Sequence, residues 1–595
     1  MIQIYVPGKG NIQLADDTSI SLKLNNPIFA DDKFIPGDYS FPFNLPGGDA
    51  SPDNARILEH PDIPDNHKNR FELQDVELSL ENNIFRKGTL LLDKANNTRY
   101  SANFRWGMKN IRDDFKNFKI RDLVDEQITI SPETYYKKVV VSWGGASLAE
   151  YSIVVNGTTF TNTTLALLAT DINNDEDLTA SFVSAGSTYG VSGDRIEIEP
   201  TADPTNPETE FTVNFESFTP LGASITSNPF TDFYADYEAF LDSYYDVSPP
   251  KDYIKFPVIL NATKENGFIN GLFINQPTST SYYFGHNTYK SSSFAPFTHL
   301  SYVFDQITDQ FAINFDGDFF DDAEYPNALF YHNHPFFTDK QYINNRGYRF
   351  YDNVINLRYT VPDITIETLL KMLQKKYNLS IVFKEDINTI RINRRKPVML
   401  SKNYVEWTGK SSNAKDIAFE DTTNGYELQS AVDESDELDT DDSYVYGDGS
   451  KIIPCDLGSI KQDEGFSYTN SFFGPYVKQK IDGKFIPRLI FYQGTDTASD
   501  GLGGTITYQR ASHKGIEVTF DGTGALGESE WLEYLRFITN RKIVQFDINL
   551  EFRDLNEIDW EKKVRIFGDD YLIKSISTRI STKSIETSKV ELYKI

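Results

Sequence analysis

The 595-residue chain contains a single cysteine, Cys455, and only seven histidines. One cysteine excludes a disulfide within the chain and any cysteine-rich metal site. A cysteine nucleophile needs a histidine beside it in the fold, and no histidine pattern accompanies Cys455 in the sequence. We therefore predict that Cys455 is a buried or half-buried packing residue.

The chain also lacks long apolar runs and an excess of positive charge. No apolar run approaches the roughly 20 residues that span a bilayer, so no membrane insertion is expected. Lys and Arg total 58 against 87 Asp and Glu, which gives a formal net charge of −29. Binding of nucleic acid by counterion release needs arrays of Lys and Arg. The start, MIQIYVPGKG, lacks the basic and apolar regions of a secretion signal, so we expect a soluble product made in a cytoplasm.

Aromatic residues, in contrast, are abundant. The chain has 44 Phe and 34 Tyr, and aromatics make up 14% of all residues. Such residues favour β-sheets. The length exceeds what one hydrophobic core supports and indicates roughly three to five domains. We predict a mainly β, multidomain protein of antiparallel barrels or sandwiches, with α+β modules and a few short helices.

Alternating segments, turns and proline-rich stretches divide the chain into five predicted domains. Residues 1–128 hold five or six alternating segments and predict an N-terminal β barrel or sandwich. Residues 129–218 combine strand segments with one helical stretch, LALLATDIN (165–173), and predict an inserted α+β module. The other predicted units are a central α+β domain (219–400), a β segment with an acidic loop (401–480) and a C-terminal β domain with one helix (481–595).

Three further stretches predict helices. In TIETLLKMLQKKYNL (365–379) apolar residues recur at helical spacing along one face, and two predicted strands, LSIVFKED and TIRINRR, follow. SEWLEYLRFI (529–538) has a similar apolar face, with Trp531, Leu535 and Ile538 expected to pack against the terminal sheet. FYADYEAFLDSYY (233–245) is an aromatic-rich candidate.

An aromatic stretch near the N-terminus, PGDYSFPFNLPGG (36–48), predicts a half-buried strand. Tyr39, Phe41 and Phe43 alternate with other residues, and Pro42 lies in the middle. Proline has no N–H for a sheet ladder and keeps to edge strands, strand starts and bulges. We therefore expect this strand at a sheet edge, docked on a neighbouring subunit or domain.

Residues 516–538 contain a G-x-G-x-x-G motif between a predicted strand and a predicted helix, as dinucleotide-binding folds do. Asp547 even follows Gly527 by 20 residues, near the expected place of a ribose-binding acid. However, the strand alternates instead of being apolar on both faces. Glu528 and Glu530 also put carboxylates where a pyrophosphate would lie. We predict no cofactor and a structural turn, with Gly524 and Gly527 at positive φ.

Two acidic stretches are candidate calcium sites. DGDFFDD offers Asp316, Asp318 and Asp322 but lacks the later bidentate glutamate of an EF-hand. The run DESDELDTDD (433–442) is expected to be a solvated, mobile loop, because like charges repel one another. We predict no metal site, and the sequence leaves calcium binding by either stretch open.

Other catalytic and metal patterns are also missing. His332 and His334 form a close pair but have no evident third ligand. No H-E-x-x-H, G-x-S-x-G or Walker A pattern occurs. We therefore predict no enzymatic activity, and assign no catalytic, cofactor-binding or metal-binding residue.

The two ends of the chain resemble one family, the tail proteins of phages and prophages of Bacteroidetes-type bacteria. NNPIFADDKFIPGDYSFPFNLPGGDASPDNARIL (25–58) resembles the start of that family. The stretch from PRLIFYQG (487–494) to YLIKSI (571–576) resembles its end. The resemblance at this end rests on YLIKSI and on Pro487, Arg488, Gly494, Gly524, Leu526, Trp531 and Leu535. In the middle, TLLKMLQKKYNLSIVF is similar to a helix–strand joint of baseplate hub proteins.

This resemblance implies a virion structural protein near the tail tip, forming the hub that closes the tail tube. Such hubs are trimeric rings in which two barrel-like domains per subunit mimic six-fold symmetry. The implied partners are tail tube or distal tail proteins, the tape measure, and tail-tip or fibre proteins. The acidic composition suits a conduit for DNA ejection, because a negative lumen repels DNA. The implied location is the virion tail, after synthesis in the host cytoplasm.

Other functions stay open at this stage. The chain could be a receptor-binding or adaptor protein of the virion. It could also be a carbohydrate-binding or carbohydrate-cleaving β-protein, which in the latter case needs two carboxylates roughly 5–9 Å apart. An unrelated cytoplasmic enzyme is the remaining alternative.

Overall fold

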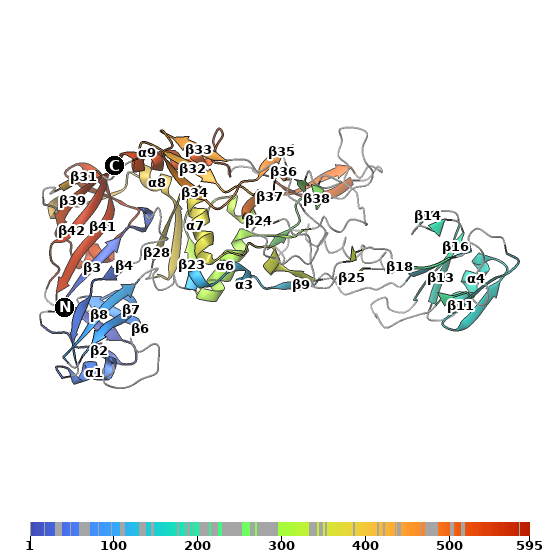
Figure 1. The fold of residues 1–595 in the computed structure, drawn as a ribbon, viewed down its shortest axis with the longest axis horizontal. Helices are drawn as coiled ribbons and strands as arrows, with labels where there is room; N and C mark the ends of the chain where they lie inside the picture. The colour runs from blue at the N-terminus through green and yellow to red at the C-terminus, as the bar shows by residue number, and fades with distance from the viewer. Residues whose placement is uncertain are drawn as a thin grey trace.

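The protein, described here from a computed structural model, is mainly β and multidomain, with mostly antiparallel sheets and few helices, as the sequence predicts (Figure 1). None of the helices in the described residues is both long and apolar enough to cross a membrane. The described residues lie within 2–58, 72–106, 114–129, 138–200, 213–215, 224–228, 253–270, 295–332, 342–350, 354–469 and 486–595, with short gaps inside most of these ranges.

Both ends of the chain contribute to one 14-stranded sheet. Its strands are β1 (Ile2–Val6), β2 (Gly10–Ile12), β3 (Ser19–Asn25), β4 (Asp38–Ser40), β5 (Phe43–Pro46), β6 (Glu72–Leu80), β7 (Asn83–Ala95), β8 (Arg99–Trp106), β30 (Tyr404–Glu406), β31 (Asp416–Phe419), β39 (Lys542–Ile548), β40 (Lys563–Ile566), β41 (Asp569–Ser581) and β42 (Ser588–Lys594). β3 and β41 pair antiparallel from Ser19 opposite Ser581 to Asn25 opposite Ser575. The marked termini lie at the same end of Figure 1.

One hydrophobic core joins these N-terminal and C-terminal strands. It contains Leu22 and Leu24 of β3 together with Ile573 and Ile576 of β41, all buried. Burial alternates along β3, as a strand with one core-facing side requires. The first and last strands, which the sequence assigned to separate domains, therefore share a sheet and a core. The exact domain limits stay a prediction.

The prediction of one edge strand across Pro42 is only partly correct, because the stretch divides into two strands and only the second, β5, pairs on one side alone among the described strands, with β8. Two short strands, β4 and β5, form on either side of Phe41 and Pro42. β4 is hydrogen-bonded on both sides, to β3 and to β8, so it lies inside the sheet. The break explains how this is possible, because Pro42 falls between strands where no ladder N–H is required. Phe41 N donates to Ser21 O at 2.8 Å just before the break.

The segment from 138 to 228 forms small sheets around its own core and lies at the opposite end of Figure 1 from the termini. Its elements are β10 (Lys138–Ser142), β11 (Tyr151–Val155), β12 (Thr158–Asn162), α4 (Leu165–Ile172), β13 (Leu178–Val183), β14 (Ser187–Thr188), β15 (Val191–Ser192), β16 (Arg195–Pro200), β17 (Val213–Asn214) and β18 (Ser224–Asn228). The predicted helix is confirmed as α4, whose N-cap Thr164 accepts a hydrogen bond from Leu167 N. Leu168 and Ile172 of α4 pack against the strands.

The central region is built around α7 (Ile366–Tyr377), which confirms the strongest predicted helix. Thr365 caps its start by accepting a hydrogen bond from Thr368 N, and Asn378 ends it in the left-handed conformation. The helix leads into the predicted strand pair, β28 (Leu379–Lys384) and β29 (Thr389–Arg394), which is antiparallel.

The other helices divide between the two cores. α3 (Ile120–Leu123), α6 (Leu300–Phe311), α8 (Arg395–Leu400) and α9 (Leu532–Asn540) share the core of α7, whereas α1 (Pro52–Leu58) and α10 (Phe552–Asn556) belong to the core of the 14-stranded sheet. The remaining strands of three or more residues are β9 (Gln127–Thr129), β20 (Ile259–Asn261), β23 (Asn314–Asp316), β24 (Ala328–Tyr331), β27 (Val354–Asn356), β32 (Tyr426–Ser430), β33 (Ser443–Tyr446), β34 (Lys451–Cys455), β35 (Lys461–Asp463), β36 (Phe466–Thr469), β37 (Arg488–Ser499) and β38 (Thr505–Ala511). The predicted helix at 233–245 lies outside the described residues.

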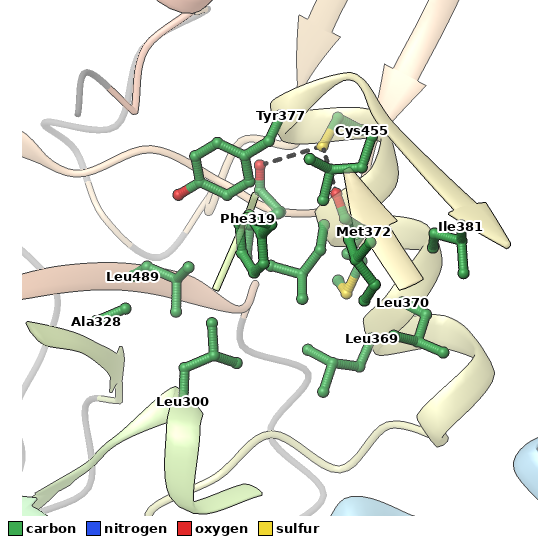
Figure 2. Packing of buried hydrophobic residues seen from close by; sticks show 14 of the residues in the cluster. Leu300, Phe319, Ala328, Leu369, Leu370, Met372, Tyr377, Ile381, Cys455 and Leu489 are labelled. Atoms are coloured by element: carbon green, nitrogen blue, oxygen red, sulfur yellow. Dashed lines mark hydrogen bonds between the residues drawn. The ribbon is translucent and has the colours of Figure 1, made fainter. Parts of the chain in front are cut away.

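Cys455, at the end of β34, lies in the core of this central region, beside Met372 of α7 (Figure 2). Its Sγ atom is 3.7 Å from the carbonyl oxygens of Met372 and Leu457. Burial raises the pKa of the Cys455 thiol to about 11. The side chain is therefore neutral and packed, as predicted, and not poised as a nucleophile.

Candidate functional site: buried charge clusters and open strand edges

The last turn of α7 places a lysine ammonium in the protein interior. Lys376 has no exposed surface, and its Nζ donates to Ser430 Oγ (2.6 Å), Ser459 Oγ (2.7 Å) and Asp442 Oδ2 (3.2 Å). Burial alone would raise the pKa of Asp442, but the Lys376 charge and the serine hydrogen bonds outweigh burial and lower that pKa below its ordinary value. Asp442 is therefore ionised at neutral pH, and the cluster is a buried ion pair.

The same ion pair positions the loop that precedes α9. Asp442 Oδ1 accepts hydrogen bonds from Phe520 N (2.6 Å) and Asp521 N (3.2 Å). The Lys376 ammonium also lies 4.4 Å from the centre of the Phe520 ring. Trp531 Nε1 donates to the Lys376 carbonyl at 3.3 Å. The cluster therefore joins α7, the acidic run and the glycine turn.

Three of the described residues of the acidic run are not solvated, contrary to what the charges of the run predicted. Asp433, Asp436 and Asp442 are all buried. Arg488 Nη1 donates to Asp436 Oδ2 (2.6 Å), and Arg488 Nη2 donates to Asp433 Oδ2 (3.2 Å). The buried cations Arg488 and Lys376 compensate these carboxylates. The three aspartates can therefore be buried although the charges of the run repel one another. Residues 437–441 lie outside the described residues.

Three of the four aspartates of DGDFFDD, Asp316, Asp318 and Asp322, bond to arginines of β29. Asp316 makes a two-point ion pair with Arg391, at 3.2 Å for both contacts. Asp322 pairs with Arg394, whose backbone N–H donates to Asp318 at 2.7 Å. These interactions fix the loop on β29. Within the described part of the chain, no group of three or more His, Cys, Asp and Glu residues is arranged to hold a metal ion.

Of the histidine pair, only His332 lies within the described residues. His332 is buried, and its Nε2 lies 2.6 Å from Pro296 O. The His332 ring also contacts the Phe297 ring, at 4.9 Å between centroids. His334 lies outside the described residues. These contacts hold His332 as a packing residue directly after β24.

The glycine motif forms a turn closed by the protein itself. Gly522 and Gly524 have positive φ, at 121° and 79°. Gly524 N lies 3.4 Å from Glu528 Oε2, so a side-chain carboxylate occupies the end of the turn. The predicted strand before the turn does not continue through 518–520, and 516–517 lie outside the described residues.

One part of the glycine prediction is wrong, because Gly527 is not among the glycines with positive φ. A Cβ atom at Gly527 would lie 2.3 Å from Tyr444 Cγ and 2.5 Å from the Phe520 carbonyl oxygen. Gly527 is therefore required for close packing, not for a left-handed conformation.

The helix after the turn begins as a π-helical turn, Gly527–Trp531, and continues as α9. Trp531, Leu535 and Ile538 are buried, as predicted. The neighbouring Phe537 packs on Tyr593 of β42 with the ring centroids 5.6 Å apart. The apolar face of this helix therefore contacts the terminal sheet and also the end of α7.

Substitution of Gly524 by Asp tests the structural interpretation of the turn. We expect a loss of about 1–2 kcal/mol, because an L-residue is strained at this positive φ. NAD, FAD and ATP should leave the melting temperature of the wild type unchanged. A ligand present at 100 times its dissociation constant would add about 2.7 kcal/mol, which differential scanning fluorimetry detects easily. A saturable shift with any of the three would contradict a purely structural turn.

Two short strands of the terminal sheet have an open side among the described strands. β30 pairs only with β40, and β31 pairs only with β39. All three residues of β30 are exposed, including Tyr404 and Val405, and Ile417 of β31 is 62% exposed. Phe567, next to β40, is also exposed. An open strand edge with exposed apolar side chains is a candidate surface for pairing with another chain.

The edge of the sheet at β2 contacts other parts of the chain. β2 is followed by Gln13, whose backbone N–H and carbonyl both bond to the side chain of Asn54 in α1, at 2.7 and 2.9 Å. Asn54 is fully buried. This edge is therefore covered by the chain itself, whereas β30, β31 and β5 each pair on one side only among the described strands of the sheet. We define β30, β31 and Phe567 as the open-edge surface.

The segment that follows β30 is hydrogen-bonded to the end of β39 and the residue after it. Ser412 N donates to Asp547 O and Asn549 N donates to Lys410 O, both at 2.9 Å. Trp407 of the same segment is buried in the shared core. The open-edge surface thus lies on strands that share the core of the 14-stranded sheet.

No protein-family model and no curated protein matches the sequence. Three solved structures are similar along the whole chain at low identity. The 43 kDa tail protein of prophage MuSo2 from Shewanella oneidensis shares 8% identity, covers 100% of this chain and 98% of its own, and superposes with a TM-score of 0.29. Prophage tail protein gp18 from Listeria monocytogenes EGD-e shares 6% identity, covers 100% of this chain and 94% of its own, and has a TM-score of 0.32. The tail protein from Neisseria meningitidis MC58 shares 9% identity, covers 100% of this chain and 95% of its own, and has a TM-score of 0.28. TM-scores this low carry no statement about function.

Proposed function

We propose that this chain is a structural protein of a phage tail, which forms the baseplate or tail-tip hub that closes the tail tube. One observation supports this most directly: the two stretches that resemble the tail family bond to each other. Asn26, in the N-terminal stretch, donates through Nδ2 to Ile573 O (2.6 Å) and through its backbone N–H to Lys574 O (3.0 Å). Both acceptors lie in YLIKSI (571–576), the strand at the end of the C-terminal stretch.

The residues after Asn26 extend this contact. Asn26 Oδ1 accepts a hydrogen bond from Ile28 N at 2.9 Å, which shapes the turn. Phe29 then packs on Phe537 and Tyr593, with ring centroids 5.5 and 4.9 Å apart. The N-terminal and C-terminal motifs thus form one structural unit, so their resemblance to one family concerns one part of the fold.

In the proposed hub the chain is a homotrimer, and the open-edge surface lies between subunits. A ring of identical copies covers strand edges through a head-to-tail interface that closes on itself. The edge of β31 carries Ile417, and β30 carries Tyr404 and Val405, which would be removed from water by such a contact.

The proposed conduit role follows from charge. With a net charge of −29, a ring of these chains repels DNA and offers it no adhesive surface. The proposed partners are tail tube or distal tail proteins, the tape measure, and tail-tip or fibre proteins. The protein would reside in the virion tail after synthesis in the host cytoplasm, and would have no enzymatic activity.

Mass photometry and negative-stain microscopy of the purified chain test the proposal. We expect ring-shaped particles with three times the mass of one chain. Antibodies against the chain should label one end of the tail in virions. A monodisperse monomer both in solution and in the virion would contradict the hub.

The variant Ile417→Glu should weaken trimer formation by more than tenfold, because it buries a charge in the proposed interface. The matched control is Leu167→Glu, which changes a similarly exposed leucine on α4, away from the open-edge surface. Mass photometry across a dilution series measures both. Equal assembly of the two variants would exclude β31 from the interface, while rings of the wild type would still support the hub.

A further inference from the structure

A small cavity lies where the end of α7, the start of α8, β34 and α9 meet. Its volume is about 50 Å³. Lys375 of α7, Arg395 of α8 and Lys451 of β34 line it, and none of the described residues that line it is acidic. In a chain with 87 acidic and 58 basic residues, three cations converge here without a carboxylate.

Two buried donors of the cavity lining lack an acceptor. Arg395 is 3% exposed and Gln374 is 6% exposed. Arg395 Nε and Gln374 Nε2 have no hydrogen-bond partner among the described residues. Buried donors are nearly always paired, so an unpaired donor beside a cavity indicates a missing acceptor.

The contacts that Arg395 does make carry no negative charge. Its Nη1 donates to Asn378 Oδ1 at 3.3 Å, and its guanidinium carbon lies 4.6 Å from the centre of the Tyr534 ring. The buried cations Lys376 and Arg488, in contrast, are both paired with carboxylates. A buried charge without a counter-ion is costly, and a bound anion would remove this cost.

We propose that this cavity binds a carboxylate group. A carboxylate accepts two hydrogen bonds side by side, which matches the planar guanidinium of Arg395. The cavity has room for this group and a short carbon stem, for which Ile453 and Trp531 provide apolar walls. Lys375 and Lys451 add positive charge from the helix and the strand.

The carboxylate has two possible sources, a free small dicarboxylate or an acidic side chain of a second copy of this chain. β34 offers an exposed route for the second source, because Lys451 and Ile452 are both exposed on it. Glutarate serves as a probe for both, since its end groups reproduce a glutamate side chain.

Glutarate should raise the melting temperature of the full-length protein with saturation, while sodium chloride at equal ionic strength should not. In Lys451→Gln the apparent dissociation constant should rise about tenfold, the usual loss for one charge-assisted hydrogen bond. The control is Lys371→Gln. Lys371 lies on α7, one turn before the lining residue Lys375, and pairs with Glu367 at 2.9 Å. Both substituted lysines have exposed side chains, so both variants should fold.

Particle mass at saturating glutarate separates the two sources. If an acidic side chain of a second copy occupies the cavity, glutarate should lower the fraction of oligomer in the wild type and not in Lys451→Gln. If a free carboxylate occupies it, the mass should stay constant while the melting temperature rises. Absence of a saturable glutarate effect on both melting and mass, or an equal effect in Lys451→Gln and wild type, would overturn the proposal.

Discussion

Arg488→Met should destabilise the central region by about 3–5 kcal/mol, the usual cost of removing one partner from a buried ion pair. Arg488 is 1% exposed and lies between Asp433 and Asp436, which are buried as well. Methionine fills much of the arginine volume but leaves two carboxylates without a counter-ion. Hydrogen exchange of the amides in β24 and β37 measures the local free energy of unfolding, which suits a multidomain chain.

Arg536→Met is the matched control, because Arg536 makes an exposed pair with Glu533 at 2.7 Å. Exposed pairs contribute about 0–1 kcal/mol, so this variant should exchange almost as the wild type does. Adding Asp433→Asn and Asp436→Asn to Arg488→Met should recover part of the loss, since the unpaired charges are then gone. A triple variant no more stable than Arg488→Met would show that packing around Arg488, not charge, carries the effect.

The elements that the sequence predicted well are those decided by neighbours in the chain. The apolar face of α7 repeats every three to four residues, and its caps, Thr365 and Asn378, flank it directly. The same holds for the strand pair β28 and β29 and for the burial of Trp531 on the helix after the glycine turn. Local pattern and tertiary packing agree in these places.

The predictions that failed depend on partners far away in the sequence. The acidic run looks solvated until Arg488, 52 residues beyond Asp436, is placed against it. Pro42 looks like an edge marker, but the strand simply breaks there and β4 lies between β3 and β8. Gly527 looks like a flexible turn residue, yet the ring of Tyr444 sets its size limit. No local pattern carries this information.

For the candidate sites, too, local sequence patterns were predictive and contacts between distant segments were not. That both chain ends resemble one family was visible in the sequence, but their pairing through Asn26 and β41 was not. The cavity beside Arg395 was also invisible, because its lysines come from segments separated by 76 residues, Lys375 and Lys451. A cation without a carboxylate can be recognised only when all its spatial neighbours are known.

Lys376→Met should cost about 3–5 kcal/mol at pH 7, because Asp442 would stay buried without its cation. Lys376 holds Asp442, Ser430 and Ser459 together, and Asp442 in turn holds the loop before α9 through Phe520 N. Hydrogen exchange in α7 and α9 should therefore accelerate together. In Lys562→Met, which removes an exposed pair with Asp559 at 3.4 Å, exchange in these helices should change by less than about 1 kcal/mol.

The stability deficit of Lys376→Met should depend on pH, and the lowered pKa of Asp442 predicts the direction of this dependence. The pKa of Asp442 is lowered in the folded protein, so its ionised form stabilises the fold above the ordinary aspartate pKa, and this contribution is lost as the pH falls through the folded-state value. Without Lys376, the main attraction that lowers the pKa of Asp442 is gone, and the group takes up a proton at higher pH. The deficit of Lys376→Met relative to wild type should therefore shrink as the pH is lowered from 7 toward 4. In the double variant with Asp442→Asn the deficit should be smaller at pH 7 and nearly independent of pH, whereas a deficit that grows on acidification would refute the ion pair as the source of stability.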